Sequence, residues 1–458
     1  MRSLITYIGL AILFLACTNN DTTEMEASSD KIKFLTVDPG HFHAALVQKS
    51  MYEDVDSVVN IYAPAGNDLQ LHLNRMNAFN TRDSDPTGWQ MKVYEGQDFF
   101  EKMIEEKKGN VVVLAGNNKK KTEYIMEAIN AGLHVYADKP MVINAQDFDL
   151  LKNAFAKAAE KDLVLYDIMT ERFEITTLMQ KELSLIPEIF GKLESGTPDN
   201  PAVVKESVHH FFKYVSGNVN IRPPWFFDVE QEGEGIVDVT THLVDLVQWE
   251  CFPNQVLDYT RDVEMLSSER WPTKLTLSDF QKVTGTNEFA DYLEKDVEND
   301  TILNVFSNGA FTYKLKDIHA RVSVIWAYQA PEGAGDTHYS IMRGTKANLV
   351  IRQGEEQNFK PKLYIEPVIE DESFEEQLTA SFETLEARYP GISLTPTKDG
   401  WEVTIPQEYH NGHEAHFTQV TEKFIEYYNN GNMPEWEVPN MITKYYTTTK
   451  ALEMASQN

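Results

Sequence analysis

Short apolar runs separated by amphipathic stretches fill the first third of the chain. The runs are rich in β-branched residues, which is typical of buried parallel strands. They lie at residues 31–37, 57–63, 111–114, 134–137 and 163–168. Turn or helical patterns lie between them, at residues 39–50, 99–107 and 121–131. Strands that alternate with helices in this way predict right-handed βαβ units. We therefore expect an α/β, Rossmann-like, doubly wound parallel sheet over residues 31–168, with the polar residues 66–95 inserted after the second strand.

Further along, the apolar positions alternate with a period of two. Residues 304–316 and 322–328 follow this pattern, and Asn308-Gly309 is a strong hairpin signal. We expect an α+β domain over residues 169–400 with a large, mostly antiparallel open sheet. Trp326 could stack on a sugar ring, but packing within the sheet is the simpler interpretation.

Two other segments of this half are predicted to lie outside the sheet. Residues 263–300 are charged and helix-prone, and we expect them to be an insertion before it. Residues 401–458 are predicted to form a C-terminal helical extension that caps the substrate side.

The N-terminus has the pattern of an export signal. Residues 1–17 are predicted to be a secretory signal: Arg2 gives a short positive region, Leu4 to Ala16 is an apolar core too short to span a bilayer, and Ala16-Cys17 resembles a lipoprotein cleavage site. We expect lipidation of Cys17, a flexible polar tether over residues 18–30, and an exported protein anchored by lipid in the periplasm or at the cell surface. Cys251 is the only other cysteine, so no intrachain disulfide is expected in the mature chain.

The charge balance limits the partners. The chain has 71 acidic and 41 basic residues, a net charge of −30. Such a charge argues against binding to nucleic acid and to an anionic membrane surface, so contact with the membrane is expected only through the lipid anchor.

Asp138-Lys139-Pro140 stands at the carboxyl end of the strand at residues 134–137. In open parallel sheets this end lines the ligand crevice. A lysine there could donate a proton, hold an anion or steer a hydride acceptor. The alternative is a solvated lysine in an ordinary loop.

The turn after the first strand has few of the glycines of a dinucleotide site. Gly40 alone fits the spacing, and Asp38 and His43 take the flanking positions. The acidic residue expected at the end of the second strand is replaced by Tyr62-Ala63-Pro64. His41 and His43 could contact phosphate or substrate, or they could simply pack in the turn.

The segment at residues 232–249 is predicted to be a buried helix with one polar stripe. Asp238, His242, Asp245 and Trp249 fall on that stripe. Asp238 and His242, four residues apart, could share a hydrogen bond that raises the basicity of the imidazole. The alternative is a buried polar pair that only orients the domains.

Three histidines near the C-terminus do not predict a metal site. His410, His413 and His416 diverge around a helix, and no thiolate or close carboxylate pair completes a tetrahedral set. No metal centre is predicted elsewhere in the chain.

Two long motifs resemble those of the glucose-fructose oxidoreductase / inositol dehydrogenase (Gfo/Idh/MocA) family. AGLHVYADKPM is similar to that family's GKHVxxEKP segment, and EGEGIVDVTTHLVDLVQW is similar to its GGGxxxDxGxHxxDxxxW helix. The resemblance covers most of residues 31–355. It implies a homo-oligomeric enzyme that uses NAD or NADP and acts on a sugar or polyol hydroxyl.

The resemblance also implies roles for particular residues. His242 would take the hydroxyl proton, Lys139 would polarise the oxygen, and Asp238 would orient both. Other residues are expected to bind the cofactor: Gly40, His41, His43, Asn117 and Asp138, together with Lys139. Substrate would be bound by Arg172, Trp225 and Asp245.

Two functions remain open at this point. The first is a sugar oxidoreductase, or a relative that cleaves glycosides by oxidising and re-reducing a sugar carbon. The second is a periplasmic or surface carbohydrate-binding protein, or a non-redox lyase or hydrolase, with a degenerate dinucleotide site. Export and the altered glycine turn favour the second, while the intact set of Lys139, Asp238 and His242 favours the first.

Overall fold

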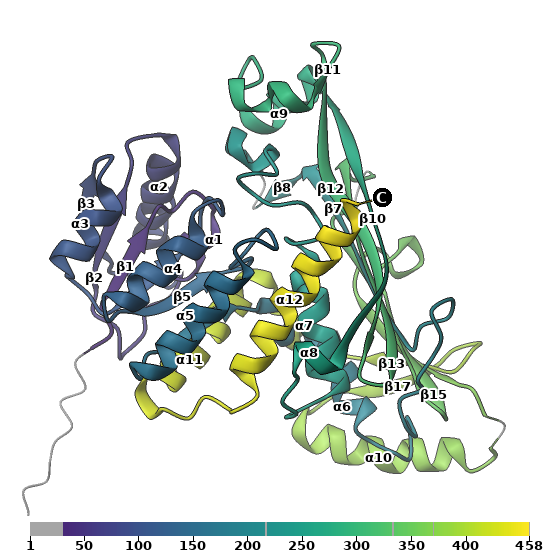
Figure 1. The fold of residues 1–458 in the computed structure, drawn as a ribbon. Helices are drawn as coiled ribbons and strands as arrows, with labels where there is room; N and C mark the ends of the chain where they lie inside the picture. The colour runs from purple at the N-terminus through teal and green to yellow at the C-terminus, as the bar shows by residue number, and fades with distance from the viewer. Residues whose placement is uncertain (1–30, 216–217, 332–333, 370, 458) are drawn as a thin grey trace, which may run out of the picture. The chain divides into compact units, whose positions relative to one another are not determined.

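The structure is a computed structural model, and it describes residues 31–215, 218–331, 334–369 and 371–457 (Figure 1). The predicted signal, Cys17 and the tether at residues 18–30 lie outside these ranges. Residues 32–458 form one unit, which contains both predicted sheets. No helix within the described ranges is long and apolar enough to cross a membrane.

The N-terminal sheet has six parallel strands, as a Rossmann-like fold requires. The strands are β1 (Phe34–Val37), β2 (Val58–Ala63), β3 (Gln90–Glu95), β4 (Val111–Leu114), β5 (His134–Asp138) and β6 (Leu165–Ile168). The helices between them are α1 (His43–Leu46), α2 (Asn67–Thr81), α3 (Phe99–Glu106), α4 (Lys121–Asn130) and α5 (Phe148–Glu160). The strand order β3-β2-β1-β4-β5-β6 reverses between β1 and β4, and ligands of such sheets bind at that reversal.

The interpretation of residues 66–95 as an insertion was wrong. They contain α2 and β3, which form an ordinary helix and edge strand of the sheet. The edge strand escaped notice because it is largely exposed, so its sequence QMKVYE lacks the continuous apolar run of a central strand.

The C-terminal domain is built on a ten-stranded sheet, mostly antiparallel as predicted. Its strands are β7 (Val203–Phe212), β10 (Val263–Thr276), β11 (Val297–Glu298), β12 (Ile302–Leu315), β13 (Ile318–Gln329), β14 (Thr337–Arg343), β15 (Ala347–Arg352), β16 (Lys362–Pro367), β17 (Ser393–Pro396) and β18 (Trp401–Thr404). β7 pairs with β13 in parallel, and β8 (Tyr214–Val215) and β9 (Asn218–Val219) form a separate small pair. The central strand β7 therefore has one parallel neighbour, β13, and one antiparallel neighbour, β14.

The helical segments of this domain cover the sheet or connect its strands. They are η1 (Thr170–Phe173), α6 (Ile175–Ser184), η2 (Pro224–Phe227), α7 (Thr240–Cys251), α8 (Tyr259–Asp262), α9 (Leu277–Thr284), η3 (Asp291–Asp296), η4 (Glu355–Gln357), α10 (Phe374–Arg388), η5 (Gln407–Tyr409), α11 (His413–Asn430) and α12 (Glu437–Ala455).

Two expectations about this sheet were wrong. Residues 263–276 are not part of a helical insertion but form the long edge strand β10, paired with β12. Asn308-Gly309 is not a hairpin turn, because it lies inside β12 and the chain reverses after Leu315. Gly309 is needed there because a Cβ would clash with Ile236, and the Asn308 side chain bonds to the backbone of Trp271 and Trp326.

The two C-terminal helices pack against the N-terminal domain. In α11, the Phe424 ring stacks on Tyr136 of β5 with centroids 4.6 Å apart. Met441 and Tyr445 of α12 belong to the core of the first sheet, whereas Ala451 and Ala455 of the same helix belong to the core of the second. These helices therefore join the two domains around the crevice at the ends of β1, β4 and β5.

Candidate active site

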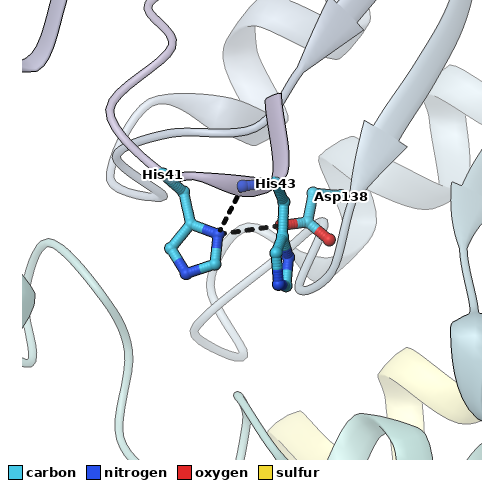
Figure 2. Close-up of side chains that lie close together, drawn as sticks. All are labelled: His41, His43 and Asp138. Atoms are coloured by element: carbon cyan, nitrogen blue, oxygen red, sulfur yellow. Dashed lines mark hydrogen bonds and ion pairs between the residues drawn. The ribbon is translucent and has the colours of Figure 1, made fainter. Parts of the chain in front are cut away.

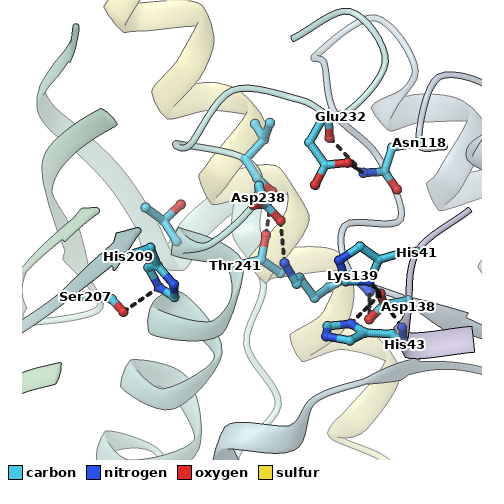
Figure 3. Close-up of polar contacts among 12 residues, drawn as sticks. His41, His43, Asn118, Asp138, Lys139, Ser207, His209, Glu232, Asp238 and Thr241 are labelled. Atoms are coloured by element: carbon cyan, nitrogen blue, oxygen red, sulfur yellow. Dashed lines mark hydrogen bonds and ion pairs between the residues drawn. The ribbon is translucent and has the colours of Figure 1, made fainter. Parts of the chain in front are cut away.

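Lys139 lies immediately after β5, where the sequence predicted it. Its ammonium group forms an ion pair with the carboxylate of Asp238 from the other domain (Figure 3). Both side chains are largely buried, with exposed fractions of 11% and 7%. The pair thus fixes the lysine at the junction of the two domains.

Asp238 reaches Lys139 because it precedes the helix instead of lying within it. The predicted helix at residues 232–249 begins only at Thr240, and residues 235–239 form turns. The predicted hydrogen bond between the Asp238 carboxylate and the His242 imidazole is absent from the described contacts. The carboxylate is paired with Lys139 instead. The Nδ1 of His242 is buried without a hydrogen-bond partner.

The pKa values of Lys139 and His242 are shifted in opposite directions. Burial lowers the pKa of Lys139, but the carboxylates of Asp238 and Asp138 outweigh it and raise the pKa above its ordinary value. Burial, with the nearby positive charge of Lys139, holds the pKa of His242 well below its ordinary value. At neutral pH the lysine is therefore a cationic hydrogen-bond donor and the histidine is a neutral base.

A cavity of about 480 Å³ lies between the two domains at this place. Of the predicted residues, it brings together His41, His43, Lys139, Asp238 and His242. His413, from the first turn of α11, lines it as well. The volume is in the range of sites that hold small ligands.

The cavity also has polar residues that the sequence analysis missed. Asp336 binds Lys213 at 2.5 Å and lies 3.3 Å from His209, whose ring stacks on Trp326. Burial raises the pKa of Asp336, but hydrogen bonds from His209 and His210 outweigh it and hold the pKa well below its ordinary value. Trp326 therefore lines the cavity as well as packing in the sheet. His209 lies on β7. The alternation of side chains along this strand was the one sequence signal that could have shown which of its residues share a face.

Arg172 and Asp245, predicted to bind substrate, do not line the cavity. The Arg172 guanidinium donates to both oxygens of Asp245 at 2.6 and 2.7 Å, and to Glu437 of α12 at 2.9 Å. Lys444 approaches the Asp245 carboxylate at 3.0 Å. We correct their role to a buried ionic cross-link, since their polar atoms are already paired with one another.

Trp225, the third predicted substrate residue, packs on the first turn of the Rossmann domain instead. Its indole nitrogen donates to Asp68 at 2.7 Å. A Cβ at Gly40 would lie 2.9 Å from the indole ring. The glycine is thus needed for the close approach of the Trp225 ring in this structure.

The crevice fits a nicotinamide dinucleotide better at one end than at the other. At the nicotinamide end, Lys139, His41 and His43 line the open cavity, and Asn117 stands just beyond β4. At the diphosphate end, the second glycine of a Rossmann turn must be free for close approach of the ligand, and here the ring of Trp225 covers Gly40. The residues present therefore fit the dinucleotide once the Trp225 ring moves off Gly40.

Asp38, at the first glycine position of this turn, has the unusual φ of 45°. Burial and the charge of Asp68 raise its pKa from 3.8 to about 6. Because the folded pKa is raised, this group favours folding below pH 4, and that contribution is lost as the pH rises through 6. We expect Asp38→Asn to stabilise the protein at pH 8 and to leave stability unchanged at pH 4, since asparagine tolerates the same φ.

Urea unfolding of wild type and Asp38→Asn at pH 4, 6 and 8 measures this difference. Asp199→Asn, at an exposed position, controls for the loss of one negative charge. An equal effect of Asp38→Asn at all three pH values would contradict the raised pKa.

Known proteins match both halves of the chain. Residues 39–166 match the family model described as "Oxidoreductase family, NAD-binding Rossmann fold" (GFO_IDH_MocA), and residues 179–456 match "Putative oxidoreductase C terminal domain". No curated protein matches the chain.

Among solved structures, a "putative oxidoreductase" from Parabacteroides merdae is 55% identical, with a TM-score of 0.92 over 93% of this chain and 98% of that one. A levoglucosan dehydrogenase, solved with NADH and L-sorbose, is 12% identical, with a TM-score of 0.59 over 93% and 97%. A biliverdin reductase from Synechocystis, solved with biliverdin and NADP+, is 10% identical, with a TM-score of 0.56 over 93% and 99%. The last two likenesses show the fold alone.

Proposed function

The chain belongs to the Gfo/Idh/MocA oxidoreductase family with an NAD-binding Rossmann fold, and we therefore propose that it is an NAD(P)-dependent enzyme that oxidises a hydroxyl group of a sugar, polyol or glycoside. The observation that carries this proposal is the combination of a cationic Lys139, paired with Asp238, and a neutral His242 on the wall of one cavity.

Oxidation of an alcohol requires removal of the hydroxyl proton and stabilisation of the oxygen that keeps the electron pair. His242 is neutral and its Nδ1 has no partner, so it suits the role of proton acceptor. The Lys139 ammonium suits donation to the substrate oxygen, and Asp238 holds it in position. The bound nicotinamide supplies the hydride acceptor.

The lining of the cavity supports a polyhydroxylated substrate. Trp326 and Phe226 contribute apolar atoms to the lining, while His209, Arg222 and Glu171 contribute polar atoms. Apolar walls with a few converging polar groups are typical of small-molecule sites. The sugar dehydrogenase with the same fold, solved with L-sorbose, is consistent with this class of substrate.

A non-redox lyase or hydrolase is the second candidate, and one observation favours it. Trp225 covers Gly40, and the negative charge of Asp68 contributes to the raised pKa of Asp38 beside the turn where a diphosphate would bind. In such an enzyme Lys139 and His242 would act as the acid and base on the same sugar without hydride transfer.

Other predictions from the sequence remain predictions. They are export through the signal at residues 1–17, lipidation of Cys17, and assembly into a homo-oligomer. The relevant N-terminal residues lie outside the described ranges.

The cofactor content of the protein tests the proposed redox function. We expect the chain from residue 31 onward, after purification and denaturation, to release NAD(H) or NADP(H), or else to bind one of them on calorimetric titration. Titration with ADP is the control, because it shares the adenosine diphosphate half but has no nicotinamide. Absence of both release and binding at millimolar NAD+ and NADP+ would overturn the redox function and leave the non-redox candidate.

A further inference from the structure

Two histidines and one carboxylate converge at the floor of the cavity (Figure 2). His41 and His43 come from the turn after β1, and Asp138 ends β5. The Asp138 Oδ2 atom lies 2.8 Å from Nδ1 of His43 and 3.6 Å from Nδ1 of His41. The ligand atoms of the three side chains all lie within 4.8 Å of one another.

One of these distances is close to that of a tetrahedral metal site. Nitrogen and oxygen ligands lie about 2.0–2.1 Å from a zinc ion, which places neighbouring ligands roughly 3.4 Å apart in a tetrahedron. The 3.6 Å separation between His41 and Asp138 is close to this value, whereas the 2.8 Å hydrogen bond between His43 and Asp138 would need to open by about half an ångström.

Hydrogen bonds hold Asp138 in place, as a metal ligand requires. Its Oδ1 accepts a hydrogen bond of 3.0 Å from the backbone N–H of Lys139, and its backbone carbonyl accepts one of 3.0 Å from Lys121. Its side chain is 5% exposed. Such outer contacts fix the orientation of a ligating carboxylate so that one oxygen remains available for the ion.

The site is closed on one side and open on the other. His41 and His43 line the cavity, whereas Asp138 lies behind them and does not. Catalytic zinc sites have this arrangement, with three protein ligands and a fourth position for water or substrate. His413 lies across the opening, its ring centroid 5.7 Å from that of His43.

The surrounding charge can accept a cation. The nearby positive groups are Lys121, Lys139, Lys213 and Arg222. Lys121 and Lys139 both interact with the carboxylates of Asp138, Asp238 and Glu232.

We propose that His41, His43 and Asp138 bind a divalent transition-metal ion of the zinc type, with its open position toward the cavity. The ion would act there as a Lewis acid on an oxygen of the substrate, beside Lys139. This site is separate from the pair formed by Lys139 and Asp238, and it would serve either redox or non-redox chemistry.

Metal binding itself is the test, and it needs no substrate. The purified chain is stripped with a chelator and titrated calorimetrically with Zn2+, and Co2+ is added as an optical probe of coordination. We expect one ion per chain, with the visible bands of a four-coordinate Co2+ site. His41→Gln and Asp138→Asn are expected to weaken Zn2+ binding by more than the roughly 10- to 100-fold that loss of an outer contact costs.

His319→Gln is the matched control, because His319 lies on β13 and is bonded to Ser195 rather than to the cavity residues. It should bind Zn2+ as the wild type does. If a cavity variant fails to fold, X-ray absorption of the wild-type Zn2+ complex decides, with two imidazole ligands and one carboxylate expected. The proposed site would be overturned if the wild type bound neither Zn2+ nor Co2+. It would also be overturned if His41→Gln and Asp138→Asn both bound Zn2+ as tightly as the wild type. NAD binding is measured separately, by the cofactor release and titration described above, so failure of the metal site and failure of the redox function are told apart.

Discussion

Replacing Lys139 with methionine is expected to lower kcat by roughly 100- to 1,000-fold, the range that one hydrogen-bond donor to the oxygen of the transition state contributes. The ammonium is the cationic group that Asp238 holds at the cavity, and methionine has similar bulk but cannot donate. The rate of NAD(P)H formation, with the most active sugar or glycoside in a screen, measures the effect.

The variant must be separated from a simple loss of fold. Removal of Lys139 alone leaves the Asp238 carboxylate buried and unpaired, which destabilises the folded protein. The double variant Lys139→Met with Asp238→Asn removes both charges, so it should recover stability but not activity. Lys119→Met, at an exposed position, is the matched control and should keep full activity. Activity in the double variant within tenfold of wild type would exclude Lys139 as the group that stabilises the substrate oxygen.

The Rossmann half of the fold was largely predictable, because its central strands are buried on both faces. Each of β1, β2, β4, β5 and β6 coincides with a mostly apolar run in the sequence, and its residues are almost all buried. The exposed edge strand β3 has no such run and was missed. Burial, rather than strand formation itself, made the pattern visible.

The errors in the second domain come from contacts that only the folded chain makes. Asn308-Gly309 has the residues of a turn, yet the glycine is there to admit Ile236 and the asparagine to bond to neighbouring strands. Likewise, the charged residues of β10 face outward along an edge strand, and in the sequence they resemble the charged residues of an exposed helix. Local propensity cannot show which long-range partner a residue has.

The candidate site was predicted in part. The motifs located Lys139, Asp238 and His242 correctly on one cavity, but not the pairing of Asp238 with Lys139 across the domains. Helical periodicity placed Asp245 on the same stripe as His242, and it could not reveal that Arg172 neutralises that carboxylate. Sequence distance also hid the cluster of His43 and Asp138, which are 95 residues apart.

The buried cross-link around Arg172 ties both domains to the C-terminal helix. Arg172 binds Asp245 of α7 and Glu437 of α12, while Lys444 of α12 lies between Asp245 and Asp167 of β6 at 3.0 and 2.6 Å. Burial raises the pKa of Asp245, but Arg172 and Lys444 outweigh it and hold the pKa well below its ordinary value. The carboxylate therefore stays ionised and depends on both cations.

Arg172→Met is accordingly expected to reduce the free energy of unfolding by about 3–5 kcal/mol, as breaking one partner out of a buried ionic group does. Glu437 loses its cation and Asp245 keeps only Lys444, so negative charge remains buried without sufficient compensation. Urea unfolding at pH 7 measures the loss. Arg388→Met removes an exposed pair with Glu182 and should cost less than about 1 kcal/mol. Adding Asp245→Asn to Arg172→Met should restore part of the stability, because it removes one of the two stranded carboxylates. A loss in Arg172→Met no larger than that in Arg388→Met would show that the cross-link does not hold the domains together.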